Sequence, residues 1–133
     1  MTKIKPKSLP PRFDADALRS AGGDKVFVRG QAYYSGGQVE ILGIERNRIR
    51  ARVAGTDIYR TELQGSGRRF SGQCTCPAFA RDDFCKHLVA TALAVNAMDA
   101  GAADAVRNRF AQIRDHQRLR PLRAQVEIGR AHV

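Results

Sequence analysis

The sequence lacks tryptophan and has only three cysteines and three histidines in 133 residues. An odd number of cysteines fits a disulfide framework poorly. No apolar run approaches the ~20 residues that a membrane-spanning helix needs, since the longest lies around Leu88 to Ala94. The start, MTKIKPKSLPPRF, has no apolar segment behind its lysines, so we expect no secretory signal. These absences predict a cytoplasmic protein, with no membrane partner, whose thiols stay reduced.

Acidic residues are scarce beside basic ones. Thirteen aspartates and glutamates stand against 23 lysines and arginines, which gives a formal net charge of +10. Such a balance favours negatively charged partners, with nucleic acid first and an acidic protein or anionic lipid after it. The hydrophobic fraction of 43% is ordinary for a globular chain, and the length suits one modest domain.

Motifs of catalysis are also missing. The sequence contains no glycine-rich phosphate loop, no nucleophile motif and no acid–base cluster apart from the cysteine-rich stretch. His116 lies between Asp115 and Gln117 in a basic segment, where a solvated surface histidine is expected. The sequence therefore predicts a binding protein that is not an enzyme and has no small-molecule substrate.

The last seven residues, EIGRAHV, resemble the translation of a common sequencing-adapter oligonucleotide. We therefore expect residues 127–133 to be an artefact, His132 to carry no functional meaning, and the natural sequence up to Val126 to be the front end of a longer protein. A natural stop codon after Val133, found by resequencing the locus, would contradict this expectation.

Two short helices are expected before the first strand. Residues 1–12 combine lysines with three prolines, a composition that resists packing and indicates a flexible basic arm. The segment from Asp14 has an acidic start and stops at the glycine pair 22–23, which favours a helix. DKVFVRGQAYY predicts a second helix that ends at the glycine pair 36–37, with a strand at 25–29 as an open alternative.

Three segments alternate apolar and polar residues, the pattern of half-buried strands. Turn-forming residues separate them, so an antiparallel meander is expected. After a glycine-rich turn at 65–67, RRFSGQC supplies one more short strand that leads into the first cysteine. The three alternating segments are QVEILGIE, RIRARVAG and DIYRTEL.

CKHLVATALAVNAM is almost wholly apolar and has the length of a helix. Its alanines and leucines favour a helix that is buried against the sheet. Asp82 or Asp83 is expected to cap the first turn. Gly101 should end or interrupt this helix, and Asp104 should open a second, basic one. The apolar face of that second helix is expected to hold Val106, Phe110 and Ile113.

The stretch CTCPAFARDDFCKH contains all the cysteines in a C-x-C-x8-C-x-H array. Three thiolates and one imidazole suit a closed tetrahedral zinc site. Strand alternation puts Cys74 and Cys76 on one side, and the helix after Cys85 would carry His87 in its first turn, where the positive helix end favours thiolates. A Cys74–Cys76 disulfide would form a strained ring and leave Cys85 alone. Four protein ligands leave no open position for a catalytic water, so the array predicts structural zinc.

This array resembles the SWIM zinc finger, whose pattern is C-x-C, a variable spacer and C-x-H. The flanking segments CKHLVATALAV and FVRGQAYYSGGQV are similar to those of the same family, so the resemblance covers residues 27–96. It implies a ββα finger whose zinc ligands are Cys74, Cys76, Cys85 and His87. Because SWIM fingers occur with SWI2/SNF2 ATPases, in transposases and in recombination-associated proteins, the resemblance also implies binding of DNA or of other proteins.

A set of six arginines forms the second signal. Four of them alternate with other residues along ERNRIRARV, where a strand would place them on one face. Guanidinium groups suit bidentate phosphate contacts, so we predict nucleic-acid binding, DNA ahead of RNA. Alternatively, acidic residues on neighbouring strands pair with them and leave only a solvated face. The six arginines are Arg46, Arg48, Arg50, Arg52, Arg68 and Arg69. The acids concerned are Glu40, Glu45 and Glu62.

A protein-interaction adaptor is the alternative function, in which the finger docks a SWI2/SNF2-type helicase or the missing C-terminal part of its own chain. The aromatic residues do not decide between these functions, because they are expected in the core more than as base-stacking platforms. The residues concerned are Tyr33, Tyr34, Tyr59, Phe70 and Phe79.

Together these features predict a single α+β domain, in which a small antiparallel sheet is followed by a zinc-clasped ββα finger and a C-terminal basic helix. The expected segments are a flexible basic arm at 1–12, a SWIM domain with its preceding meander at 13–98, a basic helical extension at 99–126 and the artefact at 127–133.

Overall fold

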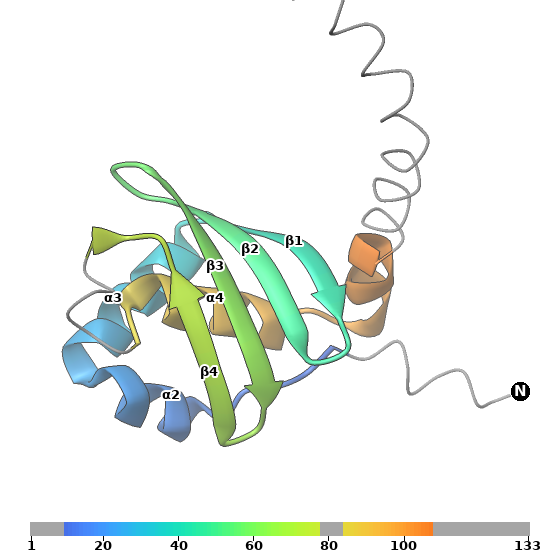
Figure 1. Ribbon diagram of the computed structural model, residues 1–133, viewed down its shortest axis with the longest axis horizontal. Coiled ribbons are helices and arrows are strands. Elements are labelled where there is room, and N and C mark those ends of the chain that lie inside the picture. The colour runs from blue at the N-terminus through green and yellow to red at the C-terminus, as the bar shows by residue number, and fades with distance from the viewer. Residues whose placement is uncertain (1–9, 78–83, 108–133) are drawn as a thin grey trace, which may run out of the picture.

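The structure is a computed structural model that describes residues 10–77 and 84–107 (Figure 1). Within these described residues, two helices precede a four-stranded sheet, and the buried helix α4 follows it. Residues 100–107 are also helical. The elements are α2 (Ala15–Gly22), α3 (Asp24–Ser35), β1 (Val39–Glu45), β2 (Arg48–Ala54), β3 (Ile58–Ser66), β4 (Arg69–Cys74) and α4 (Lys86–Asn96).

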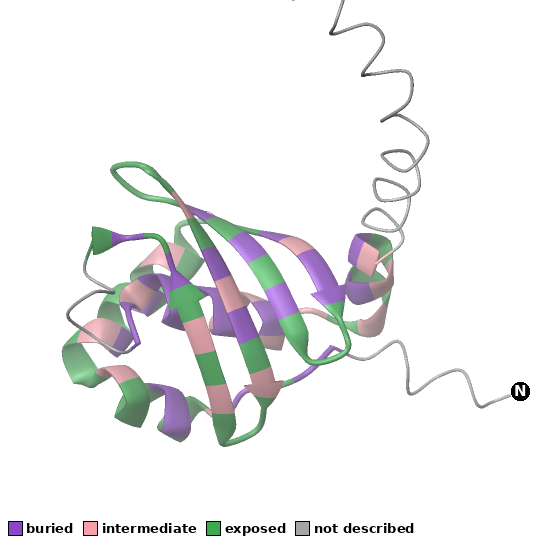
Figure 2. Cartoon of the chain, viewed as in Figure 1, coloured by how far each residue is buried: buried purple, intermediate pink, exposed green. Residues whose placement is uncertain are grey.

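The four strands form one antiparallel sheet in the order β1-β2-β3-β4, which confirms the predicted meander. Successive residues of each strand point to opposite faces of the sheet, so apolar side chains gather on one face and polar ones on the other. In β2, Ile49 and Val53 are fully buried, while Arg48, Arg50 and Arg52 on the other face are exposed. The banding of buried and exposed residues along β2 is visible in Figure 2. We call the face that carries these arginines the open face.

Helices α2 and α3 confirm the two predicted helices and exclude the strand at 25–29. The Asp14 carboxylate caps α2 by accepting a hydrogen bond from the Ala17 amide at 2.9 Å. Gly23 ends α2 and begins α3 with a φ of 90°, a conformation that glycine adopts without strain. A helix from 24 to 35 buries Phe27 and Gly30, one turn apart, on the same side.

Helix α4 confirms the predicted apolar helix and covers the inner face of the sheet, where it contacts all four strands (Figure 1). Leu88, Val89 and Val95 are fully buried. The polar Thr91 is buried as well, but its hydroxyl donates to the His87 carbonyl oxygen at 2.9 Å and meets the Thr61 hydroxyl at 2.8 Å. Burying the Thr91 hydroxyl therefore costs little free energy, because it is hydrogen-bonded and avoids the desolvation penalty of an unpaired polar group.

Of two predictions about helix starts, one falls on residues outside the described ranges and the other is wrong. Helix α4 begins after Cys85, which is its N-cap, and Asp82 and Asp83 lie outside the described residues. The next helical stretch starts at Ala100, because the Asp99 carboxylate accepts a hydrogen bond from the Ala102 amide at 2.8 Å. The prediction that Asp104 opens it was therefore wrong.

The ends of the chain are described only in part. Residues 1–9, most of the expected arm, and 108–133, which include Phe110, Ile113, His116 and the expected artefact, lie outside the described residues. Arg12 donates to the Asn96 carbonyl oxygen at 3.0 Å, and the Asn96 side chain pairs with the backbone of Phe13. Among the described helices, none is long and apolar enough to cross a membrane.

Candidate metal centre

Four potential ligands meet where β4 approaches the start of α4. The ligand atoms of Cys74, Cys76, Cys85 and His87 all lie within 4.8 Å of one another. The three cysteines are free thiols, so no disulfide competes for them. Cys76, Cys85 and His87 are each 5% exposed or less, and Cys74 is 9% exposed. This is a buried, pre-assembled set of three sulfurs and one imidazole.

The spacing of these atoms fits tetrahedral coordination. His87 Nδ1 lies 3.6 Å from the Cys74 sulfur and 3.9 Å from the Cys85 sulfur. Ligands about 2.3 Å (sulfur) and about 2.0 Å (nitrogen) from a tetrahedral metal would stand about 3.5 Å apart. The cluster therefore needs only small shifts to close on an ion, and the residues present fit a metal of the zinc type.

The end of β4 explains how the first two ligands come together. Cys74 pairs with Thr61 in the register of β3 and β4. Thr75 continues this pairing, because its amide donates to the Arg60 carbonyl oxygen at 3.1 Å. Extended residues alternate sides, so Cys74 and Cys76 are buried while Thr75 is exposed. The prediction that the two cysteines share one side is confirmed.

The start of α4 supplies the other two ligands. Cys85 is the N-cap, and its carbonyl oxygen accepts hydrogen bonds from the Leu88 and Val89 amides at 3.1 and 3.2 Å. His87 follows in the first turn, as predicted from the sequence. At this end of a helix the dipole and free amides favour negative charge, which stabilises a thiolate.

Electrostatics within the cluster differ from sulfur to sulfur. The pKa of Cys85 is lowered to about 4 despite its burial, mainly because its sulfur accepts a hydrogen bond from the Cys74 thiol. Hydrogen bonds with His87 and the Leu88 amide lower it further. The hydrogen bond between Cys74 and Cys85, together with burial, raises the pKa of Cys74. Three adjacent thiolates would repel one another, so full deprotonation of the cluster requires a cation among them.

Two tyrosines surround the imidazole of His87. The Tyr59 ring stacks on it, with centroids 4.6 Å apart and planes at 29°, and the Tyr33 ring meets it edgewise at 5.0 Å and 72°. Nδ1 faces the sulfurs, while Nε2 is buried and has no hydrogen-bond partner within the part of the chain that the structure describes. The aromatic rings therefore fix the orientation of this ligand.

Loss of one of these rings should loosen the metal. We expect Tyr33→Ala to speed transfer of the metal to a chromogenic chelator by about 10–100-fold, the range seen when groups that orient a ligand are removed. Tyr34→Ala is the matched control, since Tyr34 is 37% exposed and belongs to the same helix. Equal transfer rates for the two variants would contradict the orienting role.

Comparison with known families identifies this centre. Residues 59–96 match the family model of the SWIM zinc finger. The chain contains a SWIM zinc finger. The SWIM match runs from Tyr59 in β3 to the end of α4 and includes β4 and all four candidate ligands, while Tyr33 lies outside it. No curated protein and no solved structure matches the chain.

Three of the six arginines predicted to bind nucleic acid are ion-paired. Arg48 pairs with Glu62 at 3.3 Å, Arg52 with Glu40, and Arg68 with Asp14 at 2.8 Å. Arg46 is not on the strand face, because its φ of 56° places it in the turn before β2. For the remaining two, no ion pair is found within residues 10–77 and 84–107. These two are Arg50 and Arg69.

Sequence reasoning also missed Arg60 and the contact between Tyr33 and His87. Arg60 is exposed on β3 and lies opposite Arg52 across the strand pair. The alternation of IYRTEL could have placed Arg60 on the open face, but only the register shows which arginine it faces. The aromatic contact joins α3 to α4 and has no local signal in the sequence.

Proposed function

We propose that the chain is a zinc-binding SWIM module in which zinc is structural and takes no part in catalysis. The observation that carries this is the convergence of three cysteine sulfurs and one imidazole nitrogen within 4.8 Å. Soft thiolates with one histidine select zinc over hard cations, and four protein ligands fill its tetrahedron. Elemental analysis of the purified chain should find about one zinc per molecule. Purified, fully folded chain without bound metal would contradict the proposal.

We further propose that the module binds nucleic acid by its phosphate backbone. The net charge of +10 supports this, as do the arginines on the open face, where none of the described helices covers the sheet (Figure 1). Not all of that charge is free, because Glu40 and Glu62 each pair with an arginine. The positive charge that remains after these ion pairs are subtracted favours binding.

The test is binding of the zinc-loaded chain to a short DNA duplex of random sequence, followed as a function of salt. Backbone binding predicts an affinity that falls linearly on a log–log plot, with a slope of about −0.9 for each phosphate contacted. Affinity should depend little on base sequence. Absence of binding at low salt, with a protein partner co-purifying from the native source, would favour the adaptor function instead.

A further inference from the structure

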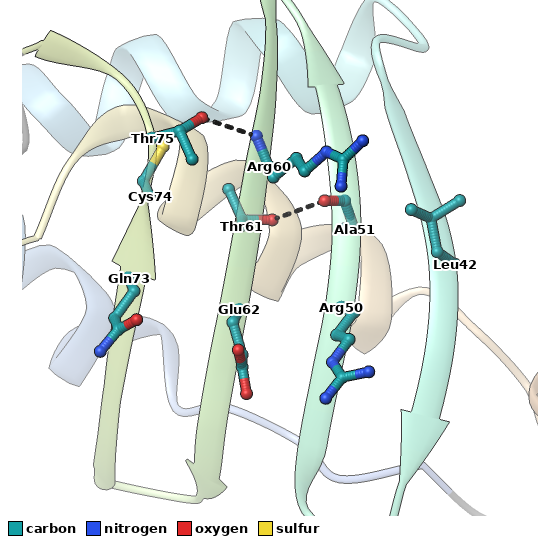
Figure 3. A pocket seen from close by; sticks show the side chains of 9 residues that line it. All are labelled: Leu42, Arg50, Ala51, Arg60, Thr61, Glu62, Gln73, Cys74 and Thr75. Carbon is teal, nitrogen blue, oxygen red and sulfur yellow. Dashed lines mark hydrogen bonds between the residues drawn. The ribbon is translucent and has the colours of Figure 1, made fainter.

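We infer that a hollow on the open face, between Arg50 and Arg60, holds a phosphate of the nucleic-acid backbone, and that the metal centre on the inner face of β4 fixes one wall of this hollow. This inference rests on the proposed nucleic-acid binding and assigns it to particular residues. The hollow has a volume of about 300 Å³. It is shown in Figure 3, with the helices behind the sheet.

The arginines of the hollow come from neighbouring strands. Arg50 extends from β2 and Arg60 from β3, and both lie on the viewer's side of the sheet in Figure 3. Gln73 of β4 and Thr75, which follows this strand, line the opposite side of the hollow and add polar groups. Two guanidinium groups with amide and hydroxyl neighbours form a donor-rich surface that suits a tetrahedral anion.

Neither arginine of the hollow has an ion pair among the described residues, although Glu62 is the direct partner of Arg50 in the register of β2 and β3. Arg52 and Arg60 are direct partners in the register of β2 and β3, an arrangement of like charges that destabilises a sheet. Arg52 is paired with Glu40, but across the described residues Arg50 and Arg60 have no ion pair. A phosphate bound beside Arg60 would offset the repulsion between Arg60 and Arg52.

One acid also lines the hollow. The Glu62 carboxylate belongs to its wall and would repel an anion if it were free. However, it pairs with Arg48 at 3.3 Å, and both side chains are partly exposed. Because Arg48 compensates the Glu62 charge, the net charge at the hollow stays positive.

Thr75 connects the metal centre to the hollow. This residue lies between the ligands Cys74 and Cys76, and its exposed side chain faces the opposite way from theirs. Its hydroxyl accepts a hydrogen bond from the Arg60 amide at 3.0 Å (Figure 3). A metal that holds both cysteines therefore holds Thr75, and with it the backbone position of Arg60.

The nature of the open face favours backbone over base recognition. The residues that line the hollow are arginine, glutamine, threonine, glutamate, leucine, alanine and cysteine, with no aromatic ring among them. Tyr59 and Phe70 belong to the inner face, where they contact His87 and Phe84. Stacking platforms are the usual device for reading splayed bases, so the occupant here is a phosphodiester of either DNA or RNA.

The experiment measures binding of zinc-loaded full chain to a random DNA duplex and to a single-stranded RNA across a range of salt. We expect Arg50→Ala and Arg60→Ala each to weaken binding to duplex DNA, and the double variant to reduce the magnitude of the log–log slope by about 0.9, because the hollow holds one phosphate. Arg29→Ala, which removes an exposed arginine of α3, is the control and should leave the slope unchanged.

Thr75→Val tests the link to the metal centre. This variant should retain zinc, because Thr75 is not a ligand, yet bind more weakly than the unmodified chain, because the oxygen that holds Arg60 is gone. If Arg29→Ala weakens binding as much as the two open-face variants, the assignment to the hollow is wrong while nucleic-acid binding stands. Wild-type binding by Thr75→Val would overturn the link, and no binding of either nucleic acid would overturn both proposals.

Discussion

Replacing Cys85 with serine is expected to abolish zinc retention and to leave the domain unfolded at room temperature. Serine is a preferred N-cap residue, so the variant can gain a side-chain cap at α4 worth about 1 kcal/mol, which Cys85 does not make. The variant also loses the binding free energy of structural zinc, which is about 10–16 kcal/mol in small zinc-finger peptides. The loss of the metal should therefore dominate by a wide margin.

Thermal unfolding followed by circular dichroism, with zinc measured in parallel, checks this prediction. Wild-type chain treated with a strong chelator should behave like Cys85→Ser, since both lack the metal. Lys86→Ala is the matched control, because Lys86 lies between two ligands but only half-buried on the helix. A cooperative transition of Cys85→Ser near that of the zinc-loaded wild type would mean that the core alone holds the fold.

Gly30→Ala should destabilise the domain although alanine is the better helix former. In the middle of a helix this change ordinarily gains about 0.5–1 kcal/mol. At Gly30 a new Cβ would lie 2.4 Å from Val89 Cγ1 and 3.0 Å from the Lys86 carbonyl oxygen. Val89 is fully buried and cannot move aside, so α3 and α4 must separate. Overpacking of this kind costs about 1–3 kcal/mol.

Chemical denaturation of the zinc-loaded chain measures this effect. Gly101→Ala is the control, because its Cβ would meet only Asp99 Oδ1, at an ordinary 3.5 Å. That variant should be unchanged or slightly more stable. If Gly30→Ala is also as stable as the wild type, the close approach of α3 to α4 is not a feature of the protein in solution.

The sheet and the ligand set could be predicted because their signals are local. Alternation in RIRARVA specifies both the strand and its buried side, and nothing in tertiary packing opposes it. The four ligands fall within one short stretch and include every cysteine. The apolar composition of α4 likewise requires burial wherever the helix is placed.

The remaining features depend on contacts between distant parts of the chain. Asp99 and Asp104 are equally good helix starts by local criteria, but starting at Asp99 adds a turn that buries Ala103 with Val106. Arg46 continues the arginine alternation in sequence, yet the turn before β2 takes it off the strand. The position of Tyr33 against His87 follows from the packing of α3 on α4, which no local pattern specifies.

X-ray absorption at the zinc edge of the purified chain tests the central claim most directly, since it reports the atoms bound to the metal. The four converging side chains predict three sulfur ligands at about 2.3 Å and one nitrogen at about 2.0 Å. A first shell made of oxygen and nitrogen, or one with fewer sulfurs and a bound water, would contradict a closed structural site formed by Cys74, Cys76, Cys85 and His87.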